Sequence, residues 1–102
     1  MIEIVNLRKT DLDRKQIQYV GRGSVLGNRF KIGINGNREQ VIQKYRRWLW
    51  NRICDHDQRV TEELDRLKEI AKKGDLVLGC WCAPKRCHAE IIKNAINWII
   101  NK

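Results

Sequence analysis

The residues best suited to chemistry lie in one ten-residue segment, Gly79-Cys80-Trp81-Cys82-Ala83-Pro84-Lys85-Arg86-Cys87-His88, which holds three of the four cysteines and one of the two histidines. Thiolate and imidazole groups are zinc ligands, and three cysteines with one histidine form a known structural zinc site. Side chains two apart in a strand point to the same face. We therefore expect Cys80, Cys82, Cys87 and His88 to hold zinc, although the spacing lacks the paired C-x2-C knuckles of stronger zinc motifs.

The same segment could instead carry thiol chemistry. A cysteine at a helix N-terminus lies at the positive end of the helix dipole, and Lys85 and Arg86 add positive charge that favours a thiolate. In that case Cys80 or Cys87 is the nucleophile and His88 the general acid or base. A third interpretation makes the cysteines small core residues and His88 a locally bonded helix-start residue.

A glycine-rich loop is the second candidate site. Backbone amides, a hydroxyl and a guanidinium in such a loop suit a phosphate or nucleotide oxygen. The candidate ligand-binding residues are Gly21, Arg22, Gly23, Ser24 and Asn28. The spacing G-x-G-x3-G, followed by Arg29-Phe30-Lys31, matches neither the dinucleotide nor the P-loop motif. By itself the loop therefore favours a structural turn with glycines at positive φ.

Positive charge is concentrated in the first half of the chain. Lysine and arginine outnumber the acidic residues by 21 to 12, giving a formal charge of +9, and residues 1–53 carry nearly all of the excess. Arg46, Arg47 and Arg52, with Trp50 off the apolar stripe, predict a helix face that grips phosphates and stacks on a base. A solvated helix face with its aromatics in the core is the alternative. Cys54, just beyond, is expected to face the core.

Hydrophobic patterning predicts the elements that position these residues. Alternating or wholly apolar runs predict strands at 2–7, 17–20 and from residue 76, while 29–34 suits a short strand or ordered coil. Asn37 and Gln40 have capping-box spacing and open a helix over about 37–53. A second helix runs to Lys73 and ends at Gly74, and a third begins near Arg86 or Cys87. Both candidate loops follow strands, so in a parallel sheet they meet at one edge.

These elements and the length of 102 residues predict one α/β domain over residues 1–102. We expect two or three layers, with a short, mostly parallel sheet of three to four strands and about three helices. The composition excludes a disordered chain, and the absence of a long apolar run or a signal-peptide pattern predicts a cytoplasmic protein with reduced thiols and no membrane partner.

Three blocks of the chain, Tyr19 to Phe30, Lys44 to Leu49 and Gly79 to His88, resemble an uncharacterised family of small bacterial and phage proteins with GRGSxLGN and GCWCxPxxCH signatures. The resemblance implies that the glycine-rich and cysteine-histidine blocks form one site. It implies no activity. This sequence has Arg29 where proline is common and Ala89 where glycine usually follows the histidine, and a methyl group at Ala89 would crowd a ligand at that helix start.

The leading functional hypothesis is therefore a protein that binds a nucleotide or nucleic acid through its basic first half, with zinc in the cysteine-histidine segment. The first alternative is a cysteine-dependent enzyme acting on a nucleotide-like, phosphorylated substrate. The second is a phage-type inhibitor or adaptor that binds a host protein, which the sequence neither supports nor contradicts.

Overall fold

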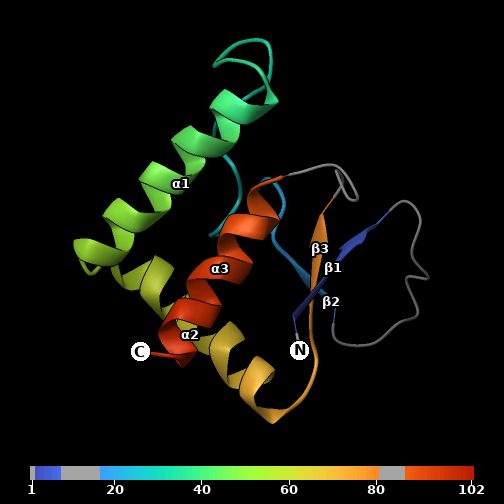
Figure 1. Ribbon diagram of the computed structural model, residues 1–102, viewed down its shortest axis with the longest axis vertical. Coiled ribbons are helices and arrows are strands. Elements are labelled where there is room, and N and C mark those ends of the chain that lie inside the picture. Colours follow the sequence, from blue (N-terminus) through green and yellow to red (C-terminus); the bar gives the residue numbers. More distant parts are fainter. Residues whose placement is uncertain (1, 8–16, 81–86) are drawn as a thin grey trace.

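The structure is a computed structural model that describes residues 2–7, 17–80 and 87–102. Along the chain the elements are β1 (Ile2–Asn6), β2 (Ile17–Tyr19), α1 (Arg38–Cys54), α2 (Gln58–Lys73), β3 (Leu76–Cys80) and α3 (His88–Ile100) (Figure 1). Every expected helix is present within one or two residues of its predicted bounds. Residues 29–34 form no strand and run as coil and turn.

The sheet confirms the predicted parallel arrangement. Its three strands lie in the order β1-β3-β2, and both pairs are parallel. Every residue of the central strand β3 is buried, as its wholly apolar start predicts. Cys80 lies opposite Asn6, and Gly79 lies opposite Tyr19. The carboxyl ends of the three strands, and the loops that follow them, are thus on the same edge.

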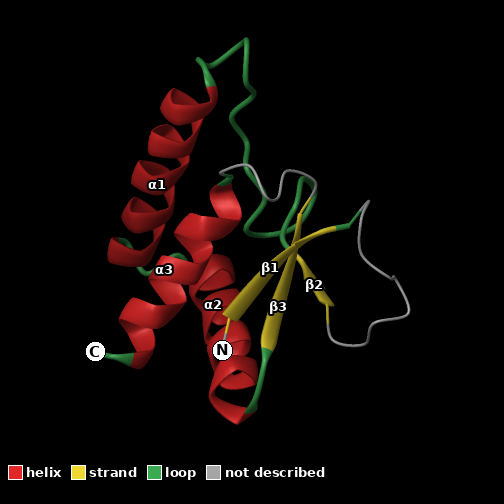
Figure 2. Ribbon diagram, turned by 45° about the vertical axis from the view of Figure 1, so that its right-hand side comes forward, coloured by secondary structure: helices red, strands yellow, loops and turns green. Residues whose placement is uncertain are grey.

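The three helices lie on one face of the sheet, which gives a two-layer fold (Figures 1 and 2). Leu76, Leu78 and Cys80 point toward the helices and belong to the main core, together with residues of all three helices. Gly79 points to the opposite face, where a Cβ would come 2.8 Å from the side chains of Ile17 and Leu7. Only glycine fits there without displacing one of these neighbours.

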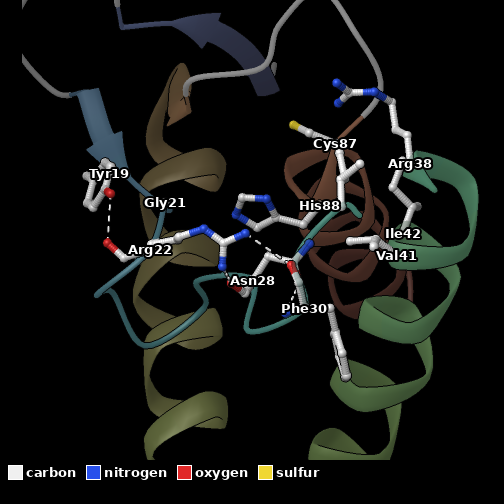
Figure 3. A pocket seen from close by; sticks show the side chains of 11 residues that line it. Tyr19, Gly21, Arg22, Asn28, Phe30, Arg38, Val41, Ile42, Cys87 and His88 are labelled. Atoms are coloured by element: carbon white, nitrogen blue, oxygen red, sulfur yellow. Dashed lines mark hydrogen bonds between the residues drawn. The ribbon is translucent and has the colours of Figure 1, made fainter. Parts of the chain in front are cut away.

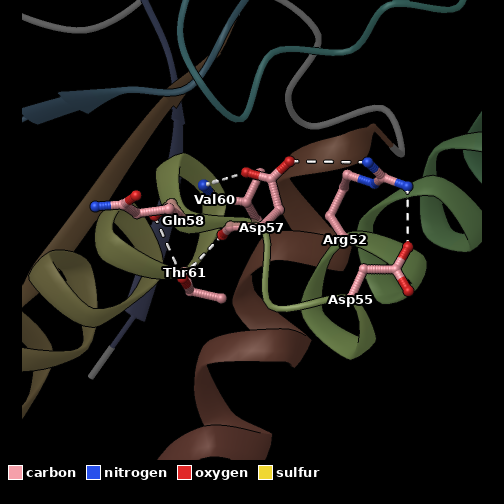
Figure 4. A network of polar contacts seen from close by, with 6 residues as sticks. All are labelled: Arg52, Asp55, Asp57, Gln58, Val60 and Thr61. Atoms are coloured by element: carbon pink, nitrogen blue, oxygen red, sulfur yellow. Dashed lines mark hydrogen bonds and ion pairs between the residues drawn. The ribbon is translucent and has the colours of Figure 1, made fainter.

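Local signals fix the ends of the helices. Asn37 caps α1 through a capping box in which its side chain accepts from the Gln40 amide at 2.9 Å and the Gln40 side chain accepts from the Asn37 amide. Asp57 caps α2 by accepting from the amide of Val60 at 3.1 Å (Figure 4). Gly74 ends α2 as predicted. No described helix combines the length and apolar character needed to span a membrane.

Candidate functional site

A cavity of about 250 Å³ lies where the loop after β2, the start of α1 and the start of α3 meet (Figure 3). It sits on the carboxyl edge of the sheet, where ligands gather in folds with parallel strands. The lining residues are Tyr19, Gly21, Arg22, Asn28, Phe30, Ile32, Arg38, Val41, Ile42, Cys87 and His88. The glycine-rich loop and the cysteine-histidine segment therefore share one cavity, and α1 supplies a third wall that the sequence did not indicate.

Arg22 shapes the loop side of this cavity. Its guanidinium donates to the backbone carbonyls of Asn28 at 2.6 Å and Phe30 at 3.1 Å, and the Tyr19 hydroxyl donates to the Arg22 carbonyl at 2.7 Å. Figure 3 shows the Arg22 side chain reaching across the loop toward Asn28 and Phe30. The side chain thus closes the loop on itself and brings a positive charge to the cavity wall.

Two of the predicted ligand-binding residues of the loop do not line the cavity. The Ser24 hydroxyl donates to the Gly21 carbonyl at 2.7 Å, and Gly23 adopts a φ of +90°, which favours glycine. Gly27 packs so tightly that a Cβ would lie 2.5 Å from the Gly21 carbonyl oxygen. Ser24, Gly23 and Gly27 form the turn, while Gly21, Arg22 and Asn28 face the cavity.

His88 is held at the first turn of α3. Its side chain is buried, its Nε2 is hydrogen-bonded to the carbonyl of Val20, and its ring meets Tyr45 edge-on with centroids 5.1 Å apart. Because a carbonyl can only accept, Nε2 carries a proton, and in the neutral ring Nδ1 keeps the lone pair. Burial lowers the pKa of His88, and the nearby positive charge of Arg22 acts in the same direction, while the bond to Val20 opposes them.

Tyr45 is a buried polar residue of the site that the sequence motifs did not indicate. It lies on the apolar stripe of α1 and is fully buried, and its hydroxyl donates to the carbonyl of Leu26 at 2.6 Å. Burial raises its pKa well above the usual tyrosine range. A tyrosine on a core-facing stripe needs a hydrogen-bond partner, which is the signal that could have identified it. Tyr45 and His88 together tie the two ends of the 20–26 segment to the helices.

Cys80 and Cys87 form a buried sulfur pair. Cys80 ends β3, Cys87 is the N-cap of α3, and their Sγ atoms are 3.5 Å apart. Both residues are almost fully buried, with 1% and 5% of their surfaces exposed. Cys82, which was expected to join them, lies outside the described residues, as do Trp81, Lys85 and Arg86.

The sulfur pair fits one half of the predicted zinc site. Two Zn–S bonds of about 2.3 Å at a tetrahedral angle place the sulfurs about 3.8 Å apart, close to the separation observed here. His88 could contribute only Nδ1, because its Nε2 is bound to Val20. Among residues 2–7, 17–80 and 87–102, no three or more His, Cys, Asp or Glu side chains are grouped closely enough to hold a metal ion. A zinc ion shared with Cys82 stays a prediction.

The proposed nucleic-acid-binding residues lie in the second half of α1, where Arg46 and Arg47 are exposed and Trp50 is partly buried against the core. Arg46, Arg47 and Trp50 line one shallow depression of about 230 Å³. The Trp50 ring packs edge-on against Trp98, with centroids 5.2 Å apart. Arg52 differs from the other two arginines, because it forms ion pairs with Asp55 at 3.1 Å and Asp57 at 3.8 Å (Figure 4).

The expectation that Cys54 faces the core is wrong. Its side chain is exposed at the last residue of α1. The buried positions Val41, Tyr45 and Leu49 follow one another every four residues, so the stripe continues to Ile53 and leaves Cys54 on the outer side.

Fold and cavity together define a small, parallel α/β domain with a largely apolar cavity, lined in part by arginine side chains, at the carboxyl edge of its sheet. The sequence matches a family model over residues 5–98, and the chain belongs to this family, described as a domain of unknown function (DUF4326). No curated protein and no solved structure matches the sequence. The family carries no described activity, so functional inference depends on the site itself.

Proposed function

We propose that this protein binds a small, anionic, nucleotide-like ligand in the cavity between the glycine-rich loop, α1 and α3. One observation carries the proposal: two arginines from different elements, Arg22 and Arg38, line the same cavity as Asn28 and His88. Guanidinium groups form strong, charge-assisted hydrogen bonds with phosphate oxygens. A cavity with two of them is suited to a phosphorylated ligand.

The remaining walls suit the uncharged part of a nucleotide. Phe30, Val41 and Ile42 supply an apolar surface that can cover a base or a sugar ring. The volume of about 250 Å³ lies just below the range of roughly 300–1,000 Å³ that is typical of ligand pockets. The ligand is therefore a mononucleotide or a smaller phosphorylated molecule.

Calorimetric titration with nucleoside monophosphates at low salt tests this proposal. Replacing Arg38 by glutamine removes a cation from the cavity wall. Because a charged hydrogen bond contributes about 1.5–3 kcal/mol, affinity should fall at least about tenfold. Arg47→Gln is the matched control, since it removes the same charge from the same helix outside the cavity. Equal affinity in the Arg38 variant and the wild type would contradict the proposal.

A second candidate function is nucleic-acid binding on the outer side of α1. It is favoured by the shared depression of Arg46, Arg47 and Trp50, and by Lys44, which lines an adjoining depression with Arg47. Because Arg52 is paired with two carboxylates, phosphate binding on this surface would depend on Arg46, Arg47 and Lys44.

Oligonucleotide binding measured over a range of salt concentrations separates the two candidates. If α1 binds the phosphate backbone, Arg47→Gln should weaken the binding of all sequences similarly and reduce the salt slope by about one. Arg38→Gln should then have the smaller effect. Loss of mononucleotide binding in the Arg38 variant, with oligonucleotide binding unchanged, assigns the two ligands to separate surfaces.

A further inference from the structure

The proposed ligand binding in the cavity does not use the buried sulfur pair of Cys80 and Cys87. From its geometry we infer that Cys80 and Cys87 are a redox-active dithiol that reacts with small, anionic disulfides entering the cavity. A disulfide requires two sulfurs that can approach to about 2.05 Å, and Sγ atoms 3.5 Å apart need only a small shift to reach that distance. The inference does not depend on nucleotide binding.

Both cysteines are almost fully buried, but Cys87 lines the cavity and Cys80 does not, which assigns their roles. Cys87 lines the cavity and caps α3, whereas Cys80 is 1% exposed and is not among the cavity residues. A thiolate at the N-terminus of a helix is stabilised by the positive end of the dipole. Cys87 is thus the attacking sulfur, and Cys80 is the resolving sulfur behind it.

The reaction proceeds in two exchange steps. The Cys87 thiolate attacks one sulfur of the incoming disulfide, which forms a mixed disulfide and releases the first small thiol. Cys80 then gives up its proton to solvent and attacks the Cys87 sulfur, which releases the second small thiol and leaves a Cys80–Cys87 disulfide. The protein loses two electrons and two protons, and the small disulfide gains them.

The charge of the cavity selects the class of disulfide. Arg22 and Arg38 line the same space as Cys87, so a carboxylate-bearing disulfide is attracted and an ammonium-bearing one is repelled. Opposite charge in a confined site raises association rates by about tenfold or more, and salt reduces this advantage.

Three disulfides of similar size test this selection: dithiodipropionate is anionic, 2-hydroxyethyl disulfide is neutral, and cystamine is cationic. Each rate with the reduced, folded protein is divided by the rate with the urea-unfolded chain, because the leaving thiols differ in reactivity. The normalised rate should be highest for the anion and lowest for the cation, by about tenfold between these two at low salt. Equal or reversed rates would overturn the assignment of an anionic substrate.

Peptide mapping by mass spectrometry tests the pair itself. Wild-type protein should form the Cys80–Cys87 disulfide, while Cys80→Ala should stop at the mixed disulfide on Cys87. Cys87→Ala should lose the reaction, and Cys54→Ala should retain it because Cys54 is a separate, exposed thiol. The mapping of wild-type protein needs no variant, so it decides the question even if a variant fails to fold.

Two results would overturn the proposal that Cys80 and Cys87 are a redox-active dithiol. One is a disulfide formed through Cys82 or Cys54 with Cys80 or Cys87 still reduced. The other is one zinc ion per chain in protein purified without chelators, lost in Cys87→Ala, because a metal shared by these sulfurs removes them from exchange.

Discussion

At the scale of single residues, the site depends on buried polar groups that each have a defined partner. His88 is bonded to the Val20 carbonyl and Tyr45 to the Leu26 carbonyl, and the two rings are in contact. Leaving a buried carbonyl without a partner costs more than the hydrogen bond itself contributes. These two side chains therefore hold the glycine-rich loop against the helices.

Tyr45→Phe should lower the free energy of unfolding by about 1–2 kcal/mol, because the Leu26 carbonyl loses its partner inside the core. Urea denaturation followed by far-UV circular dichroism measures the change. Tyr19→Phe is the control, since it removes a similar bond, to the Arg22 carbonyl, from a side chain that is 42% exposed. A smaller effect for Tyr45 than for Tyr19 would contradict this role.

The lowered pKa of His88 makes stability depend on pH in a defined direction. The unfolded chain takes up a proton on His88 near the ordinary histidine pKa of 6.5, whereas the folded protein does so only at lower pH. In that window the unfolded state binds more protons, so the free energy of unfolding falls as the pH falls below about 6.5.

His88→Gln should remove this contribution. Urea denaturation at pH 7.5 and at pH 5.5 should show a smaller loss of stability in the variant than in the wild type. His56→Gln is the matched control, because His56 is exposed between α1 and α2. An unchanged pH dependence in His88→Gln would show that the folded protein does not keep His88 neutral.

At the scale of elements, the predictions were most accurate where a short-range signal acts alone. The capping box at Asn37 and the stop at Gly74 both lie where the pattern placed them. The Cys54 prediction failed because one position at a helix end changes which face a side chain occupies. Tyr45 was overlooked because its role depends on a partner 19 residues earlier in the chain.

The cap at Asn37 supports the helix that forms one wall of the cavity. Asn37→Ala removes the hydrogen bond that the Asn37 side chain accepts from the Gln40 amide, while the backbone amide of residue 37 can still donate to the Gln40 side chain. This change should lower the free energy of unfolding by about 1 kcal/mol. Asn51→Ala, at an exposed position in the same helix, should change it by much less. Thermal or urea denaturation of both variants measures the difference, and equal losses would contradict a capping role.

The turn of the glycine-rich loop depends on Gly27. A methyl group there would lie 2.5 Å from the Gly21 carbonyl oxygen, which is backbone and cannot rotate away. Gly27→Ala should therefore lower both stability and mononucleotide affinity. Gly74→Ala is the control, because its methyl group would meet no atom within 4 Å, and it should change stability by no more than about 1 kcal/mol.

At the scale of the whole molecule, a parallel sheet brings distant segments to one edge. The α/β class, the single sheet and the convergence of the two unusual loops could be predicted, because alternating strands and helices leave few topologies. The cavity wall contributed by α1 could not be predicted from the sequence, because the position of Arg38 depends on how the chain between Asn28 and Asn37 returns across the sheet edge. Short-range sequence patterns contain no information about such long-range placement.

The buried pair of Cys80 and Cys87 was also only partly predictable from the sequence. The sequence placed Cys80 and Cys87 near each other through the expected strand end and helix start. It could not separate a metal site from thiol chemistry, because both require cysteine sulfurs that lie close together in space. The orientation of His88 toward Val20 is a tertiary contact 68 residues apart in the chain, and it leaves only Nδ1 for any ligand.

Ligand binding in the cavity shared by the glycine-rich loop, α1 and α3 can be observed residue by residue. The most direct measurement is a titration of isotope-labelled protein with a nucleoside monophosphate, followed by amide chemical shifts. We expect saturating shifts centred on Gly21, Arg22, Asn28 and His88. Shifts centred on Arg46 to Trp50 instead, or no saturating change at millimolar ligand, would contradict it.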